Sequence, residues 1–211
     1  MTQTLTLHDI GKSFSGKVLY HQLSYTFHTG CYVITGPNGI GKTVLMEMLA
    51  GIFQPDVGSI VLNGMDHPDS YAYKKQLTYI PSKPTFFPTT TGKDFFNLML
   101  SIKNKQLMHA AQDCAERFNL LPFFDTPFEQ LSFGTQKKFF LTMLAMHGTN
   151  GIVLLDEPTN ALDESANLFL YPTIQSLAKH AIVIIITHDQ LCLNHLNAIP
   201  LAIQKTPLTA F

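Results

Sequence analysis

Gly36-Pro37-Asn38-Gly39-Ile40-Gly41-Lys42-Thr43 is the most informative stretch of this 211-residue chain. Residues 31–34 before it are apolar and predict a β-strand, and residues 42–51 predict a helix with Gly51 beyond its end. Glycines at this spacing allow backbone N–H groups to converge on phosphate groups, and the N-terminus of the helix adds its dipole. A glycine-rich turn without function rarely has this strand and helix around it, so the stretch predicts a phosphate-binding loop.

The side chains of this loop predict how a nucleotide is held. Lys42 places a positive charge near the β- and γ-phosphates, and the Thr43 hydroxyl is a candidate ligand of Mg²⁺. The remaining residues expected to contact the nucleotide are Gly36, Pro37, Asn38, Gly39, Ile40, Gly41 and Val44.

A pair of carboxylates follows a second apolar segment, residues 152–155. In a parallel sheet the carboxyl ends of the strands form the ligand-binding edge. Asp156 is therefore a candidate ligand of Mg²⁺, and Glu157 is a candidate for orienting the water that attacks the γ-phosphate. Taken alone, such a pair is more often a helix cap or a solvated pair; beside a phosphate-binding loop, the catalytic interpretation is favoured.

Composition excludes several classes of protein. Hydrophobic residues make up 45% of the chain and charged residues 14%, which is typical of a folded protein and not of a disordered one. The net charge of −1 provides no field for binding nucleic acid. The three cysteines have no zinc or disulfide spacing, and we find neither a secretory signal nor an apolar run that could span a bilayer. We therefore expect a cytoplasmic protein.

The pattern along the chain predicts an α/β fold. Alternating residues near the N-terminus indicate antiparallel strands, whereas continuous apolar runs farther on indicate a buried parallel sheet. Strands are predicted at residues 5–10, 23–27, 31–34, 59–62, 77–80, 152–155, 182–186 and 199–203, and helical segments at 42–51, 93–121, 132–146 and 164–179. We expect a single domain over residues 1–211, in which a helical subdomain at about 84–133 is inserted into the core.

Four further segments resemble the ATP-binding cassette (ABC) ATPases. Leu131-Ser132-Phe133-Gly134-Thr135-Gln136-Lys137-Lys138 is similar to the signature segment of that family, and residues 158–163 resemble its dimer-contact loop. Thr187-His188-Asp189 is similar to its switch histidine segment, and Phe14 stands where the family usually has an aromatic residue that stacks on adenine. Together with the loop and the acidic pair, these motifs cover nearly the whole chain, and the resemblance implies a P-loop NTPase core.

The resemblance also implies how the sites are assembled. In this family two cassettes dimerise head to tail, and each ATP lies between the phosphate-binding loop of one subunit and the signature of the other. Ser132 and the Gly134 backbone are then expected to reach the γ-phosphate of the opposite ATP, and His188 to contact the γ-phosphate of its own. Without the family, Ser132 is simply a helix N-cap and His188 a polar loop residue, and Ser132 can serve both roles.

The chain departs from the family pattern at the position of a glutamine that touches Mg²⁺ and the attacking water. Ser82 stands there, and its shorter side chain is expected to reach the metal only through a bridging water or after movement of the loop. We therefore expect slower hydrolysis, or looser coupling to a partner, than in cassettes with the glutamine. Phe133 and Thr135 replace the more usual glycine and glutamine of the signature.

Cassettes of this size resemble the nucleotide-binding subunits of small exporter-type transporters, whose integral membrane permease subunits are separate chains. The resemblance implies an ATPase that is peripheral on the cytoplasmic face of the inner membrane, with the helical subdomain docking on the permease. Phenylalanines of that region are either core or part of this docking patch: Phe86, Phe87, Phe95, Phe96, Phe123, Phe124 and Phe128. Two alternatives stay open, namely a soluble Fe–S cluster assembly cassette and a regulatory cassette without activity.

Overall fold

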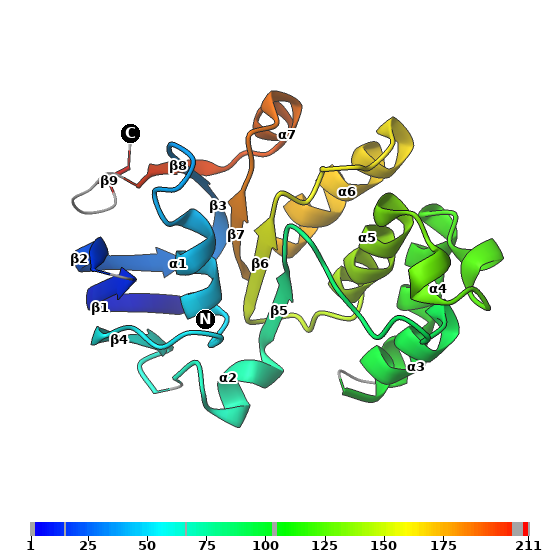
Figure 1. The fold of residues 1–211 in the computed structure, drawn as a ribbon, viewed down its shortest axis with the longest axis horizontal. Coiled ribbons are helices and arrows are strands. Elements are labelled where there is room, and N and C mark those ends of the chain that lie inside the picture. Colours follow the sequence, from blue (N-terminus) through cyan, green and yellow to red (C-terminus); the bar gives the residue numbers. More distant parts are fainter. Residues whose placement is uncertain (1–2, 15, 66, 103–104, 204–208, 211) are drawn as a thin grey trace.

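The computed structural model describes residues 3–14, 16–65, 67–102, 105–203 and 209–210 (Figure 1). The strands are β1 Thr4–Phe14, β2 Lys17–His28, β3 Gly30–Thr35, β4 Val57–Leu62, β5 Leu77–Ile80, β6 Ile152–Asp156, β7 Ile182–Ile186, β8 Ile199–Ala202 and β9 Thr209–Ala210. The α-helices are α1 Lys42–Leu49, α2 Tyr71–Lys75, α3 Gly92–Ile102, α4 Met108–Arg117, α5 Phe133–Leu141, α6 Glu164–Leu177 and α7 Gln190–His195.

A mainly parallel sheet forms the centre, with strand order β5-β6-β7-β3-β8-β9. The first five strands in this order, β5, β6, β7, β3 and β8, run parallel to one another. The last strand, β9, pairs antiparallel with β8. Every residue of β6 and β7 is buried, which explains their continuous apolar sequences. Cys31, Val183 and Val153 lie in register across three neighbouring strands. The carboxyl ends of β3, β7 and β6 therefore meet at one edge of the sheet.

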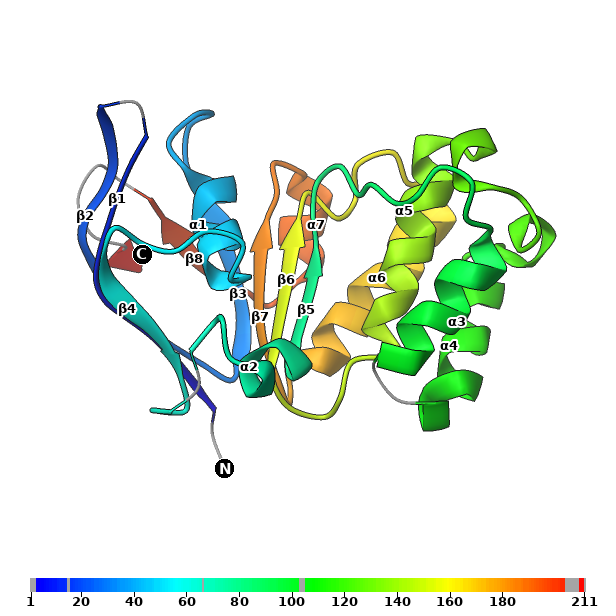
Figure 2. The ribbon, with the colours of Figure 1, turned by 60° about the horizontal axis from the view of Figure 1, so that its bottom comes forward.

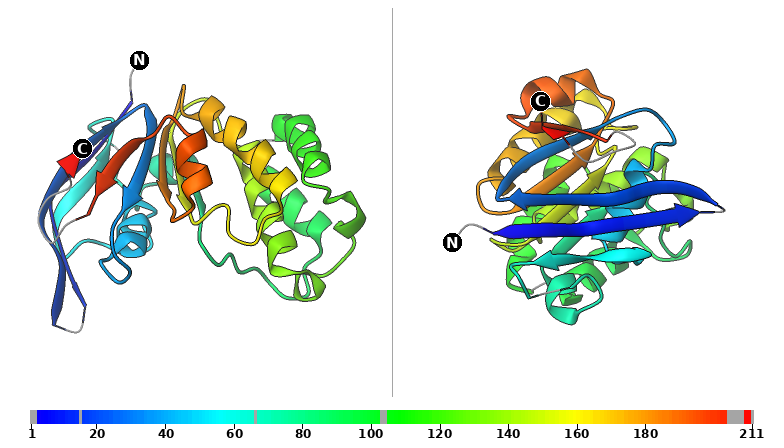
Figure 3. Two further views of the ribbon diagram at one scale, coloured as in Figure 1. Left: turned by 90° about the horizontal axis from the view of Figure 1, so that it is seen from above. Right: turned by 90° about the vertical axis from the view of Figure 1, so that its left-hand side faces the viewer.

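A smaller antiparallel sheet, with order β2-β1-β4, contains the N-terminal strands. Figures 2 and 3 show this sheet and α1 on one side of the central sheet, and α3 to α6 on the other. Two apolar clusters correspond to these two sides: one joins α1 to the small sheet, and the other joins the larger helices to the central sheet. The predicted α/β fold, with a parallel core and an antiparallel N-terminal part, is confirmed; the single domain over residues 1–211 stays a prediction.

Most of the phenylalanines noted in the sequence belong to the second cluster. Phe86 lies 5.0 Å from Phe95 and 5.4 Å from Phe128, measured between ring centroids. Phe87 and Phe123 differ, because 69% and 39% of their surfaces are exposed. The aromatic content of this region is therefore mainly core, with two rings at the surface.

Capping residues define where several helices begin. The Ser132 hydroxyl accepts a hydrogen bond from the Thr135 amide at the start of α5, and the Asp163 carboxylate accepts one from Ala166 at the start of α6. The helical pattern over residues 93–121 is divided into α3 and α4, and α5 ends five residues earlier than the predicted 146. The short helices α2 and α7 were not predicted. None of the helices in the described ranges is long and apolar enough to cross a membrane.

Candidate nucleotide-binding and catalytic site

A pocket of about 360 Å³ opens at the edge of the central sheet where β3, β6 and β7 end. It brings together the phosphate-binding loop, the acidic pair, Ser82 and His188, which are far apart in the sequence. The lining residues are Leu19, Asn38, Gly39, Gly41, Lys42, Thr43, Val44, Ser82, Asp156, Glu157, Ile186 and His188. Leu19 and Ile186 were not predicted as site residues. The sequence of an apolar strand does not show which of its residues line a pocket and which belong to the core.

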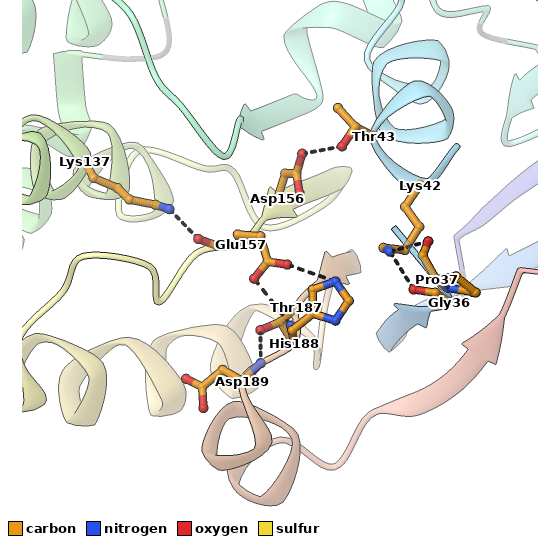
Figure 4. Close-up of polar contacts among 10 residues, drawn as sticks. All are labelled: Gly36, Pro37, Lys42, Thr43, Lys137, Asp156, Glu157, Thr187, His188 and Asp189. Carbon is orange, nitrogen blue, oxygen red and sulfur yellow. Dashed lines mark hydrogen bonds and ion pairs between the residues drawn. The ribbon is translucent and has the colours of Figure 1, made fainter. Parts of the chain in front are cut away.

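The phosphate-binding loop connects β3 to α1. Gly41 has a φ of 116° in the left-handed region, and a Cβ added there would lie 2.9 Å from the Tyr20 hydroxyl, so the position needs glycine. The Lys42 ammonium donates to the carbonyls of Gly36 at 2.7 Å and Pro37 at 3.2 Å (Figure 4). These contacts hold a positive charge over the loop, beside the space in which a phosphate would lie. Gly36, Pro37 and Ile40 shape the loop from outside the pocket lining.

Oxygen atoms of three segments meet beside the loop. The Thr43 hydroxyl donates to the Asp156 carboxylate at 3.0 Å, and Ser82 lines the pocket beside that carboxylate. Burial raises the pKa of Asp156, and the hydrogen bond from Thr43 and the nearby ammonium groups of Lys137 and Lys42 partly offset this increase. The predicted grouping of Thr43, Asp156 and Ser82 is thus present as one cluster of oxygens.

Glu157 follows Asp156 directly and faces His188. One carboxylate oxygen of Glu157, Oε1, lies 3.7 Å from the His188 Nε2 (Figure 4). The other, Oε2, accepts a hydrogen bond from the His188 backbone amide at 3.4 Å. Only 15% of the Glu157 side chain is exposed, compared with 57% of that of His188. A carboxylate so placed can accept a proton from a water molecule in the pocket.

Lys137, in the second turn of α5, is a site residue that was not predicted from the sequence. Its side chain is fully buried, and its ammonium donates to the backbone carbonyl of Glu157 (Figure 4) and, at 3.4 Å, to that of Ser82. Burial lowers the pKa of Lys137 to about 8, although the carboxylates of Glu157 and Asp156 oppose this shift. The sequence does contain an indication that Lys137 faces the protein interior: it lies four residues from both Phe133 and Leu141, on an apolar face of the helix.

Besides Gly36, Pro37 and Ile40, three more predicted residues lie outside the pocket lining. Ser132 and Gly134 are at the start of α5, where Ser132 is exposed and caps the helix. The Phe14 ring packs edge-on against Phe53 at 5.7 Å, and the Lys12 ammonium lies 5.1 Å from its centroid. The structure thus groups the loop, the acidic pair, Ser82 and His188, and leaves Ser132 and Phe14 at the surface.

Comparison with known proteins agrees with this arrangement. The family described as "ABC transporter" matches residues 20–160, which is more than half of the chain. The chain belongs to the ABC transporter family of ATP-binding domains. The matched range contains the phosphate-binding loop, the signature segment and the acidic pair. ABC ATP-binding domains are ATPases.

Two curated relatives illustrate the likeness in sequence. The molybdate/tungstate import ATP-binding protein WtpC of Methanocaldococcus jannaschii is 32% identical over 90% of this chain and 63% of its own length. The Nod factor export ATP-binding protein I of Sinorhizobium fredii is 28% identical over 89% of this chain and 58% of its own. This ABC domain therefore spans about 60% of the length of these relatives.

The structure of an ATP-binding cassette, solved as a dimer in a post-hydrolysis state with ADP and Pi, superposes with a TM-score of 0.80. The identity is 17%, and the superposition covers 97% of this chain and 96% of the other. At this identity the likeness shows that the fold is shared.

Substitution of Gly134 in the ABC signature tests how closely α5 packs against the loop after β6. A Cβ added at Gly134 would lie 2.4 Å from the Ala161 carbonyl oxygen. We expect Gly134→Ala to lower the free energy of unfolding by about 1–3 kcal/mol, because this clash outweighs the gain in helix propensity. Chemical denaturation measures the change. Gly148→Ala is the control, since an added Cβ there meets no atom closer than 3.9 Å; equal stability of both variants would contradict the prediction.

Proposed function

We propose that this chain is the ATP-binding and ATP-hydrolysing subunit of an ABC transporter. The observation that carries the proposal is the convergence of the phosphate-binding loop, Asp156, Glu157 and His188 in one pocket at the carboxyl edge of a parallel sheet. Each of these elements alone has another explanation, but their common pocket contains the groups that phosphoryl transfer to water requires.

Binding of ATP is assigned to the phosphate-binding loop. Backbone N–H groups at the start of α1 and the Lys42 ammonium would hold the phosphates. The donor set beside the loop fits Mg²⁺, because Thr43 and Asp156 offer a hydroxyl and a carboxylate, and Mg²⁺ binds one or two carboxylates together with substrate phosphates. When bound, Mg²⁺ would neutralise charge that develops on the phosphate oxygens. Phe14 is proposed to stack on the adenine, as the family resemblance implies.

Hydrolysis is assigned to Glu157 as general base. Its carboxylate lines the pocket beside Asp156 and would take a proton from the attacking water. His188 lines the same pocket and faces this carboxylate, from which position its ring would contact the γ-phosphate. A group that contacts both the carboxylate and the γ-phosphate can link the presence of ATP to the geometry of the catalytic pair.

A homodimer with two ATP molecules at its interface is the proposed active form. Ser132 is exposed and Gly134 lies outside the pocket of its own chain, as expected if they complete the site of a second copy. The superposed cassette with ADP and Pi is itself a dimer, which supports this arrangement. The N-terminus of α5 would add positive potential toward the γ-phosphate across the interface.

The proposed partners are integral membrane permease subunits, with the chain on the cytoplasmic face of the membrane. The relatives' names describe ATP-binding proteins of molybdate/tungstate import and of Nod factor export. Phe87 and Phe123 are the exposed rings of the helical region that are available for such a contact. Export is the direction expected from the sequence. It is not confirmed, because the relatives that match this chain include proteins named for import and proteins named for export.

Ser82 provides a test of the hydrolysis mechanism. Its side chain lies beside Asp156 in the pocket lining and is too short to extend farther toward the attacking water. We expect Ser82→Gln to raise the turnover number by about three- to tenfold, because a glutamine amide can orient this water. Steady-state phosphate release measures the effect. Ser82→Ala, which removes only the serine hydroxyl, is the control; an unchanged or lower rate in Ser82→Gln would count against the assignment.

Purification of the tagged chain from native membranes in mild detergent tests the transporter assignment. A membrane protein with several spanning segments, recovered in stoichiometric amount, would support the proposal and point to the substrate. Recovery with a soluble scaffold protein of Fe–S cluster assembly would refute it in favour of the alternative, while leaving the ATPase assignment unchanged.

A further inference from the structure

We propose that Lys137 is a positioning residue for hydrolysis, which holds the backbone of Glu157 so that its carboxylate points into the pocket. The inference rests on the proposed ATPase function. Lys137 belongs to α5, whereas Glu157 follows β6 and Ser82 follows β5. One buried ammonium therefore connects three segments of the site through the carbonyls of Glu157 and Ser82.

The backbone of Glu157 needs such support. Its φ is 49°, in the left-handed region that a residue with a Cβ adopts only at a cost in free energy. The Glu157 amide donates to the Ile186 carbonyl at 2.8 Å, which fixes one side of the residue to the end of β7. The Lys137 ammonium fixes the other side through the Glu157 carbonyl. The two contacts together set the direction in which the Glu157 side chain leaves the backbone.

The chemistry of Lys137 favours a role in orientation over one in packing. A buried ammonium is costly to desolvate, and an apolar side chain of similar volume often gives equal or greater stability. Hydrogen bonds from a charged donor are shorter and stronger than neutral ones. The Phe133 ring, 5.8 Å from the Lys137 nitrogen, adds a favourable contact for the charge. A lysine at this buried position thus gives firm placement of the two carbonyls.

Lys137→Met tests the inference, because methionine fills the space without donating a hydrogen bond. We expect the turnover number to fall about 10- to 100-fold, since a misplacement near 1 Å has effects of this size, while the KM for ATP changes less than about threefold. Lys137→Arg, which retains a charged donor, is expected to keep the turnover number within about threefold of the wild type. Lys74→Met, at an exposed lysine of α2, is the control.

A double-mutant cycle separates positioning from general destabilisation. If Lys137 acts through Glu157, Lys137→Met lowers the residual single-turnover rate of Glu157→Gln by less than about twofold. A full additional 10-fold loss in the double variant, or a wild-type turnover number in Lys137→Met, would overturn the inference. Should Lys137→Met not fold, Lys137→Leu, which likewise has no donor, takes its place, and the same results are expected. Absence of ATP hydrolysis by the wild type would instead refute the proposed function itself.

Discussion

Glu157→Gln is expected to lower ATP turnover by about a thousandfold while leaving ATP binding intact. General bases contribute factors of about 10² to 10⁴ to the rate, and an amide cannot take the proton of the attacking water. Glutamine has nearly the same size as glutamate, so the fold and the phosphate-binding loop are expected to persist. Steady-state phosphate release measures the rate, and titration with ATP measures the affinity.

The variant is also expected to accumulate as an ATP-bound dimer, because reopening of the dimer is proposed to follow hydrolysis. Light scattering with ATP would show about twice the molar mass observed without it. Glu116→Gln is a suitable control, since Glu116 is exposed in α4 outside the pocket lining and a glutamate carboxylate is likewise converted to an amide. Turnover of Glu157→Gln at the wild-type rate would show that Glu157 is not the general base.

Lys42→Ala is expected to reduce the affinity for ATP by about 100-fold or more. A hydrogen bond to a charged group contributes about 1.5–3 kcal/mol, and here the ammonium would contact two phosphate groups. In the structure this ammonium donates to carbonyls of its own loop, and it can exchange those contacts for contacts with phosphate oxygens. Calorimetric titration with ATP measures the loss.

Lys93→Ala is the control for Lys42→Ala, because Lys93 is an exposed lysine of α3 that lies outside the pocket lining. It is expected to bind ATP with no more than about a threefold change in affinity, since replacing an exposed lysine outside the pocket has little effect. Equal affinities of Lys42→Ala and wild type would mean that the nucleotide does not occupy the predicted loop.

The predictable part of the structure follows from local rules. The buried parallel strands β6 and β7 show as continuous apolar runs, and β5 was predicted with its observed limits. Residues placed at the ends of such strands reach one edge because neighbouring parallel strands end together. For this reason the grouping of Thr43, Asp156 and Glu157 could be predicted before the fold was known, whereas His188 was expected there only from the family resemblance.

The parts that escaped prediction depend on tertiary contacts. Helices of five and six residues, such as α2 and α7, are too short to establish a 3.6-residue period. The contact of Lys137 with Glu157 requires α5 to lie against the end of β6, and a lysine in a sequence is usually read as exposed. The position of Ser82 beside Asp156 in the pocket likewise depends on how β5 and β6 end side by side.

The central claim, that this chain hydrolyses ATP as a dimer, is tested most directly by phosphate release from Mg-ATP at increasing concentrations of the purified chain. We predict that the wild-type chain releases phosphate and that the Glu157→Gln variant does not. We also predict that the specific activity rises with protein concentration, because each site needs residues from a second copy of the chain. Release no greater than that of Glu157→Gln at every concentration would contradict the ATPase assignment, and a constant specific activity over a range in which the chain is monomeric would contradict the dimeric site.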